Sequence, residues 1–249
     1  MKKILLLSAI TSSLFAMSSQ EVAKRAYNAL SGYKSSISYA TITIKNPSGA
    51  KKEVKLEIKR LESKNGDKSM ATFLSPKNLK GTKLLSYEVV GGDAKQWIYI
   101  PSLKMIKRVS SRKKQGTLMG SEFSYEDISS QNYKSYKYSA DAKEEIIDNI
   151  AYYKITRVPK SANSAYSKQV IWVKKANFLP SEGEYYDKQN RLFKRVYFLK
   201  YKHIDKVARV VKMKIVNAQN NKSSTLTVTK DKIDAHINSN AFAKSALKR

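Results

Sequence analysis

The chain has 249 residues, a formal net charge of +28 and no cysteine. A chain without cysteine has no disulfide framework, no thiol nucleophile and no cysteine to carry a lipid anchor. Of its 48 basic residues, 39 are lysine and nine are arginine, the side chain suited to bidentate recognition of bases and phosphates. The composition therefore argues against nucleic acid as a partner. The charge predicts either contact with an anionic surface or a coat of lysine that keeps strand edges apart.

The first 18 residues have the parts of a signal peptide for export. Lys2 and Lys3 form a basic head, residues 4–10 are almost all apolar, and small residues follow. The apolar run is shorter than the roughly 20 residues that a membrane-spanning helix needs. We expect cleavage at about residues 16–18, and loss of these two lysines lowers the net charge from +28 to +26. The exported chain is expected in the periplasm, with secretion from the cell as the alternative.

A helix and then a long series of strands follow the leader. Residues 18–33 predict the helix, because Ser18 and Glu21 fit a capping box and apolar residues recur at helical spacing. From there the chain alternates with a period of two, which is typical of half-buried antiparallel strands. Turn signals separate the strands, which we expect at 41–44, 54–58, 70–74, 82–90, 95–100, 105–109, 133–138, 146–158 as a hairpin, 168–174, 178–186, 192–201, 207–216 and 226–228. A short helix or tail is expected at 241–249.

These elements predict a mainly β (α+β) protein with one large antiparallel sheet. Such a sheet curls, because strands twist and open sheets rarely exceed about ten strands without closing or splitting. No linker, repeat or shift in composition divides the chain. We therefore expect a single domain at residues 19–249.

The sequence contains no positive sign of catalysis. His203 and His236 have no neighbouring residues at metal-ligand spacing, and nucleophile-elbow, Walker and dinucleotide-binding motifs are absent. Glu126 and Asp127 are adjacent and diverge on a helix, so they do not form a two-carboxylate hydrolase site. We predict no enzyme activity, no cofactor and no metal. A hydrolase built from distant residues is the least favoured hypothesis.

Residues 96–128 are the most informative stretch, and they indicate binding. They join an aromatic strand, a proline turn, a basic strand, a basic loop at 112–114 and an apolar-acidic segment with Leu118, Met119 and Phe123. Large apolar side chains in a loop need a place to be buried, and methionine adapts to varied apolar ligands. The loop therefore predicts a lid over an apolar groove. The two tryptophans either fill the core or line that groove.

Several segments taken together resemble the LolA-like outer membrane lipoprotein-sorting family, and specifically its longer branch. They are 76–85 (PKNLKGTKLL), 96–102 (QWIYIPS), Arg108, 120–128 (GSEFSYEDI), Trp172, 179–180 and 185–187. The resemblance covers essentially the whole mature chain. It implies an antiparallel sheet curled into an incomplete barrel, with an N-terminal helix and a loop or short-helix lid over an apolar cavity.

The resemblance also implies a periplasmic carrier that shields acyl chains between the inner and outer membranes. The implied partners are an acylated lipoprotein or lipid cargo, an inner-membrane exporter, an outer-membrane acceptor and, transiently, an anionic membrane surface. The groove and lid candidates are Trp97, Tyr99, Leu118, Met119, Phe123, Tyr125 and Trp172, with Arg108, Glu126 and Asp127 as polar lid or rim residues. The alternative is a basic periplasmic module for an anionic envelope polymer or lipopolysaccharide, without an acyl-chain cavity.

Overall fold

The structure is a computed structural model that describes residues 16–110, 116–129 and 131–248. The predicted signal peptide up to residue 15 and the basic loop at 112–114 lie outside the described residues. In the described part of the chain, no helix has the length and apolar character needed to cross a bilayer.

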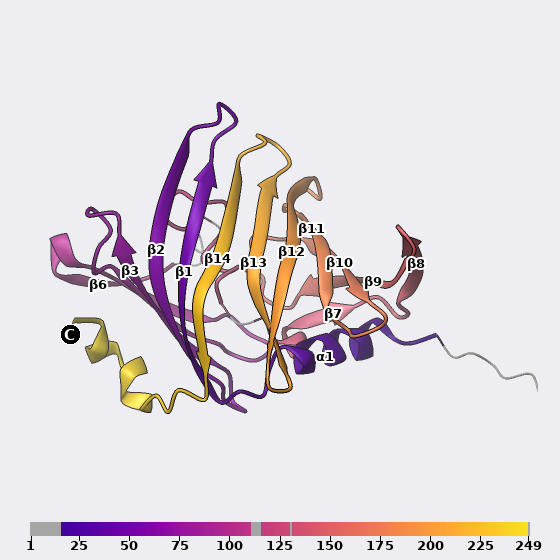
Figure 1. Cartoon of the computed structure of the whole chain (residues 1–249), viewed down its shortest axis with the longest axis horizontal. Helices are drawn as coiled ribbons and strands as arrows, with labels where there is room; N and C mark the ends of the chain where they lie inside the picture. Colours follow the sequence, from indigo (N-terminus) through magenta and orange to yellow (C-terminus); the bar gives the residue numbers. More distant parts are fainter. Residues whose placement is uncertain (1–15, 111–115, 130, 249) are drawn as a thin grey trace, which may run out of the picture.

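One α-helix, α1 (Ser19–Ala29), precedes the sheet. The predicted cap is confirmed, because Ser18 Oγ accepts a hydrogen bond from the Glu21 backbone N–H at 3.2 Å. Val22, Ala23 and Ala26 form the buried stripe of the helix, which packs against strand β9. The helix therefore covers one face of the sheet near its end, as Figure 1 shows.

The sheet has 14 strands, and every pair of neighbours is antiparallel. They are β1 (Ser35–Lys45), β2 (Lys51–Leu61), β3 (Lys68–Ser75), β4 (Lys83–Tyr87), β5 (Lys95–Ile100), β6 (Met105–Arg108), β7 (Tyr136–Tyr138), β8 (Lys143–Ile147), β9 (Ile150–Pro159), β10 (Lys168–Lys174), β11 (Pro180–Tyr186), β12 (Leu192–Ile204), β13 (Val207–Asn217) and β14 (Ser223–Ile233). Four short 3-10 helices accompany them: η1 (Pro101–Leu103), η2 (Tyr133–Ser135), η3 (Ser239–Phe242) and η4 (Lys244–Lys248).

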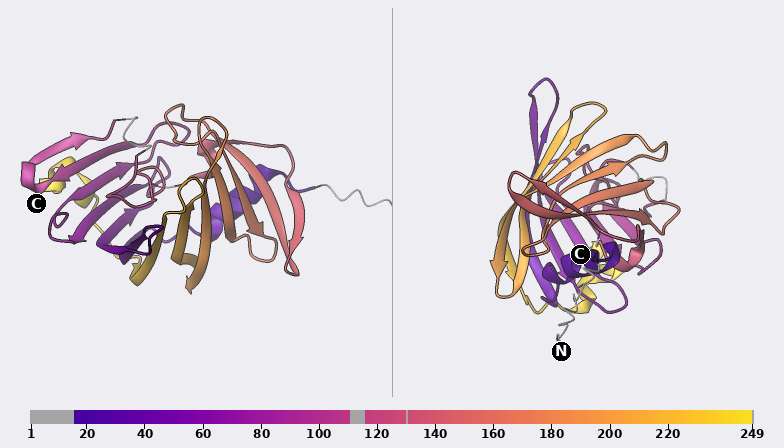
Figure 2. Two further views of the ribbon diagram at one scale, coloured as in Figure 1. Left: turned by 90° about the horizontal axis from the view of Figure 1, so that it is seen from above. Right: turned by 90° about the vertical axis from the view of Figure 1, so that its right-hand side faces the viewer.

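The strand order is β6-β5-β4-β3-β2-β1-β14-β13-β12-β11-β10-β9-β7, with β8 paired to β9 beside β7. The first and last strands of the chain, β1 and β14, thus pair in the middle of the sheet. Figures 1 and 2 show that the sheet curls but does not close. The predicted mainly β fold with a curled, incomplete barrel is confirmed.

The sheet has two apolar faces, because alternate residues of a strand point to opposite sides. The inner face, which α1 covers, carries Ile42, Leu56 and Phe73, each almost fully buried. The outer face of β3, β4 and β5 carries Met70, Leu85 and Trp97. There the C-terminal segment, residues 237–248, packs with Phe242 and Leu247 against the sheet, at the lower left in Figure 1.

Candidate functional site

An irregular segment, residues 116–129, crosses the inner face of the sheet, and we call it the lid segment. Leu118 and Phe123 are fully buried in the inner-face cluster, and Ile128 is buried beside them. The Leu118 backbone N–H donates to the Phe123 carbonyl at 2.6 Å, which closes a tight loop between them. Full burial of each such side chain contributes about 1.5–3 kcal/mol. The lid segment's own side chains thus fill the apolar space that the sequence predicts beneath it.

A buried ionic contact holds the lid segment to strand β12. Lys194 Nζ lies 2.9 Å from Asp127 Oδ2 and 2.9 Å from Tyr166 Oη, and Tyr166 Oη donates to Asp127 Oδ1 at 2.7 Å. The Ser124 N–H donates to Asp127 Oδ2 at 2.8 Å, and Ser124 Oγ accepts from the Asp127 N–H at 3.1 Å. We call Asp127, Lys194 and Tyr166 the latch.

The latch is almost sealed from solvent. The side chains of Lys194 and Asp127 are 2% and 5% exposed. Burial and the neighbouring Asp127 carboxylate hold the pKa of Tyr166 well above its usual range. The phenol therefore stays protonated and donates a hydrogen bond to Asp127. A buried pair of this kind is a weak source of net stability, but removal of one partner leaves a costly uncompensated charge.

Two further carboxylates anchor the lid segment. Glu126 accepts hydrogen bonds from Ser164 Oγ at 2.7 Å and from the Ala165 N–H at 2.8 Å. Burial raises the pKa of Glu126, against the effect of these hydrogen bonds. Glu122 is 2% exposed and accepts from Asn217 Nδ2 at 2.9 Å, and Lys222 Nζ lies 3.6 Å from its carboxylate.

Side chains on strands β2 and β5, in the other half of the sheet, also donate hydrogen bonds to the lid segment. Gln96 Nε2 on β5 donates to the Tyr125 carbonyl at 2.9 Å and to Ser129 Oγ at 3.0 Å. Arg60 Nη2 on β2 donates to the Ile128 carbonyl at 3.2 Å. The lid segment is therefore tied to both halves of the curled sheet, and its opening must break polar contacts on both sides.

The structure brings one group of the predicted site residues together. Leu118 and Phe123 lie in the inner-face cluster, Asp127 belongs to the latch, and Glu126 anchors the same segment at Ser164 and Ala165. Met119 and Tyr125 pack, partly buried, against the same cluster, and are the remaining members of this group.

Other predicted residues lie elsewhere. Trp97 and Tyr99 belong to the outer-face cluster under the C-terminal segment, where Lys244 Nζ lies 4.5 Å from the centre of the Trp97 ring. Trp172 also points outward, and its Nε1 donates to Glu145 at 2.8 Å. Arg108 is exposed on β6, opposite Trp97 in the strand register. We therefore leave these four residues out of the inner-face site.

Sequence reasoning missed Lys194 and Tyr166. Lys194 could have been found, since Arg195 is exposed while Val196 is buried, and alternation then directs Lys194 to the inner face. A lysine at a core position needs a buried carboxylate, which Asp127 supplies. Tyr166 comes from the loop before β10 and carries no such periodic signal.

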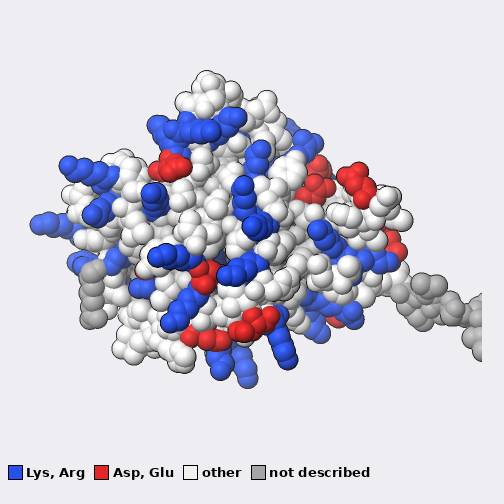
Figure 3. Space-filling view, viewed as in Figure 1, with Lys and Arg blue, Asp and Glu red and all other residues white. Residues whose placement is uncertain are grey.

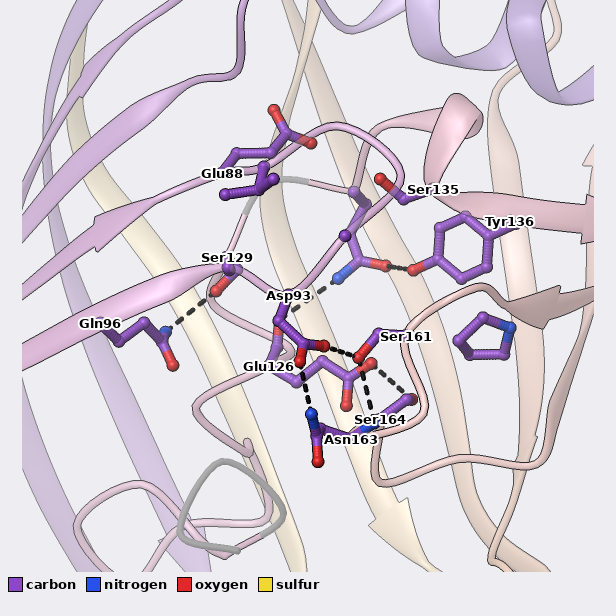
Figure 4. A pocket seen from close by; sticks show the side chains of 15 residues that line it. Glu88, Asp93, Gln96, Glu126, Ser129, Ser135, Tyr136, Ser161, Asn163 and Ser164 are labelled. Carbon is purple, nitrogen blue, oxygen red and sulfur yellow. Dashed lines mark hydrogen bonds between the residues drawn. The ribbon is translucent and has the colours of Figure 1, made fainter. Parts of the chain in front are cut away.

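A small pocket lies beside the lid segment, where Gln96 contacts Ser129 and Glu126 contacts Ser164 (Figure 4). Its volume is about 70 Å³. Asp93 accepts hydrogen bonds there from Ser161 and Asn163. At this volume the pocket is too small for an acyl chain. Within the described ranges, no group of three or more His, Cys, Asp and Glu residues is placed to hold a metal ion.

An open, curled antiparallel sheet with an apolar inner face, a helix and an anchored lid defines a class of half-barrel proteins. An outer membrane lipoprotein-sorting protein domain from Vibrio parahaemolyticus, so described, is 34% identical, has a TM-score of 0.87, and the match covers 92% of this chain and 98% of that one. A DUF1329 family protein from Desulfovibrio piger is 26% identical with a TM-score of 0.85, over 92% and 97% of the two chains.

A LolA superfamily protein from Nitrosomonas europaea has the same fold, with a TM-score of 0.77 at 20% identity over 93% of this chain and 100% of that one. A family model described only as that of an uncharacterized protein matches residues 65–249. No curated protein sequence matches significantly. The chain belongs to the outer membrane lipoprotein-sorting family, which confirms the resemblance seen in the sequence, and it shares the fold of the LolA superfamily protein.

Proposed function

We propose that this chain is a periplasmic carrier that shields acyl chains between the inner face of its sheet and the lid segment. One observation carries the proposal: Leu118 and Phe123 are fully buried although they belong to an irregular loop that, in its described residues, forms no strand of the sheet. A loop of this kind can leave the face as a unit. The surface it would expose is apolar and continuous across both halves of the sheet.

The exchange follows from the energies of burial. An acyl chain gains about 0.8 kcal/mol for each CH₂ that leaves water, so it can replace the apolar side chains of the lid segment on the inner face. Opening also separates Asp127 from Lys194, and that cost keeps an empty carrier closed. The net affinity for an acyl chain is set by the difference between the free energy gained on its burial and the free energy needed to open the lid segment. A carrier needs that balance, because it must also release its cargo to an acceptor.

The relatives support the same proposal. A protein described as a lipoprotein-sorting domain matches almost the whole chain. We accordingly propose an acylated lipoprotein or lipid as cargo, an inner-membrane exporter as donor and an outer-membrane acceptor. No enzyme activity is proposed.

Native mass spectrometry of the mature protein purified from its own periplasm, followed by solvent extraction, tests the proposal. We expect a stoichiometric acylated molecule. In the double variant Leu118→Asp/Phe123→Asp the lid can no longer cover an acyl chain with apolar surface, so loading should be lost while the β-sheet signal in circular dichroism stays.

A matched control is Phe242→Asp, which places the same charge in the outer-face cluster, where Phe242 is 1% exposed. This variant should keep its cargo if it folds. An empty wild-type protein that also fails to bind a fluorescent fatty acid would sink the carrier proposal. It would favour the basic binding module, for which the full burial of Leu118 and Phe123 against the inner face is the supporting observation.

A further inference from the structure

Two hairpin turns at opposite ends of the molecule expose large apolar side chains. We call residues 101–108, which form the turn after β5 and strand β6, the β5–β6 tip. In it Leu103 is 51% exposed and Met105 is 49% exposed. Between β8 and β9, Ile146 is 78% exposed, with Ile147 and Ile150 beside it at 39% and 41%. In Figure 1 the first turn is at the far left and the second at the far right.

The two turns differ in charge. The β5–β6 hairpin carries three exposed cations, Lys104, Lys107 and Arg108. The β8–β9 turn instead carries the exposed acidic residues Glu144 and Asp148. On the face that Figure 3 shows, the charged side chains at the left-hand end are all basic, whereas acidic and basic side chains are mixed at the right-hand end.

A second loop enlarges the basic, apolar surface of the β5–β6 tip. The loop between β3 and β4 packs against it, since a methyl group placed at Gly81 would lie 3.2 Å from Cγ of Pro101. This loop carries the exposed lysines Lys77 and Lys80, and Leu74 at its start is 41% exposed. Three exposed apolar side chains and five cations therefore share one end of the sheet.

We propose that the β5–β6 tip is the point at which this protein contacts an anionic bilayer. Leu103 and Met105 enter the headgroup region, and the surrounding cations meet lipid phosphates; these cations are Lys77, Lys80, Lys104, Lys107 and Arg108. Apolar residues ringed by basic ones suit the membrane interface, where attraction to anionic lipid acts within a Debye length of about 8 Å. The β8–β9 turn lacks this complementarity.

This contact is a separate property from acyl-chain binding. The tip has no residue in the lid segment or the latch, so its loss leaves the inner-face site intact. It fixes the orientation in which the carrier approaches a membrane. The edge strand β6 faces the bilayer, and the β8–β9 hairpin points away from it.

Vesicle sedimentation of the full mature chain is the first test. Binding is compared between vesicles of phosphatidylethanolamine with phosphatidylglycerol and vesicles of phosphatidylethanolamine with phosphatidylcholine. We expect binding to the anionic vesicles, weakened at least threefold by Leu103→Ser/Met105→Ser. The matched apolar control Ile146→Ser/Ile150→Ser should bind as the wild type does.

Charge is tested in the same way. Lys104→Ser/Lys107→Ser should weaken binding roughly 25-fold, because each of the two lysines near an anionic surface contributes a factor of about five. Lys202→Ser/Lys206→Ser removes the same charge from the β12–β13 hairpin, where Lys202 near the end of β12 and Lys206 in the turn are both exposed. Equal losses in both variants would show general attraction of a basic protein and would overturn the proposal.

A second measurement uses the absence of cysteine from the chain. A single Leu103→Cys substitution, labelled with an environment-sensitive fluorophore, should shift to the blue on addition of anionic vesicles. The same label at Ile146→Cys should not respond. A response at Ile146→Cys alone, or at neither position, would overturn the proposal; the second result would point to an acidic protein as the occupant of the tip.

Discussion

Lys194 stands at a position where the alternation of its strand calls for an apolar side chain. It is 2% exposed and touches both other members of the latch. The buried Lys194–Asp127 pair adds little to the free energy of unfolding. Its effect is to fix the position of Asp127. The latch fixes the register of the lid segment on the inner face, which apolar contacts alone specify loosely.

Replacement of Lys194 by methionine should destabilise the ligand-free protein by about 3–5 kcal/mol, because it leaves the Asp127 carboxylate buried without its cation. Urea unfolding measures this loss. The double variant Lys194→Met/Asp127→Asn should recover much of it, because the uncompensated charge is gone. Lys202→Met, at an exposed position of the same strand, is the control. Additive effects of the two substitutions would mean that the latch residues act independently.

Glu126 gives the lid segment a pH dependence. Burial raises its pKa above the usual value of 4.5, so the folded chain holds this proton more tightly than the unfolded chain does. The resulting stability is fully present below pH 4.5 and is lost as the pH rises through the raised pKa. Glu126→Gln stays neutral throughout and avoids that loss.

The stability of Glu126→Gln relative to the wild type should therefore increase from below pH 4.5 toward neutral pH, on top of a constant offset from altered hydrogen bonds. Urea unfolding of both proteins at a series of pH values gives the difference directly. Parallel stability curves would show that Glu126 titrates alike in the folded and unfolded chains.

At the scale of elements, the proposed carrier function requires the lid segment to compete with the cargo for the inner face. Phe123 fills inner-face space that an acyl chain would otherwise take. Phe123→Ala should destabilise the ligand-free protein by about 3–5 kcal/mol and leave an apolar cavity. Because the lid stays apolar, the same variant should bind a fluorescent fatty acid more tightly than the wild type does.

Phe242→Ala is the control, since it empties a similar volume in the outer-face cluster. It should lower stability by a comparable amount and leave the fatty-acid affinity unchanged. Weaker binding by Phe123→Ala would mean that the side chain contacts the ligand more than it competes with it.

Period-two alternation predicted most strands, and large apolar side chains in a loop predicted the apolar lid, because both signals are local. It did not predict which face of β5 the Trp97 side chain would occupy in relation to the lid. Alternation shows only that Trp97 and Tyr99 share a face, and the segment that covers it lies at the far end of the chain. The latch was missed for the same reason: Tyr166 and Lys194 are brought to Asp127 by strand pairing between distant parts of the sequence.

At the scale of the whole molecule, the order of the strands joins the two ends of the sequence. The pairing of β1 with β14 links the β1–β6 half of the sheet to the β7–β14 half, and the lid segment crosses both. The C-terminal segment lies beyond β14 and packs on the outer face. The molecule therefore has two covered apolar faces, each covered by a different segment, and we expect the two covers to act independently.

Removal of residues 237–249 tests that independence. The inner face, the latch and all strands remain, so fatty-acid binding should persist. On the outer face Trp97, now 9% exposed, would meet water, and its fluorescence should shift to the red. Exposure of Met70 and Leu85 as well should promote self-association, measurable by light scattering. Lys244→Ala, which removes only the cation above the Trp97 ring, should do neither. Loss of fatty-acid binding in the truncated chain would instead show that the two faces are coupled through the sheet between them.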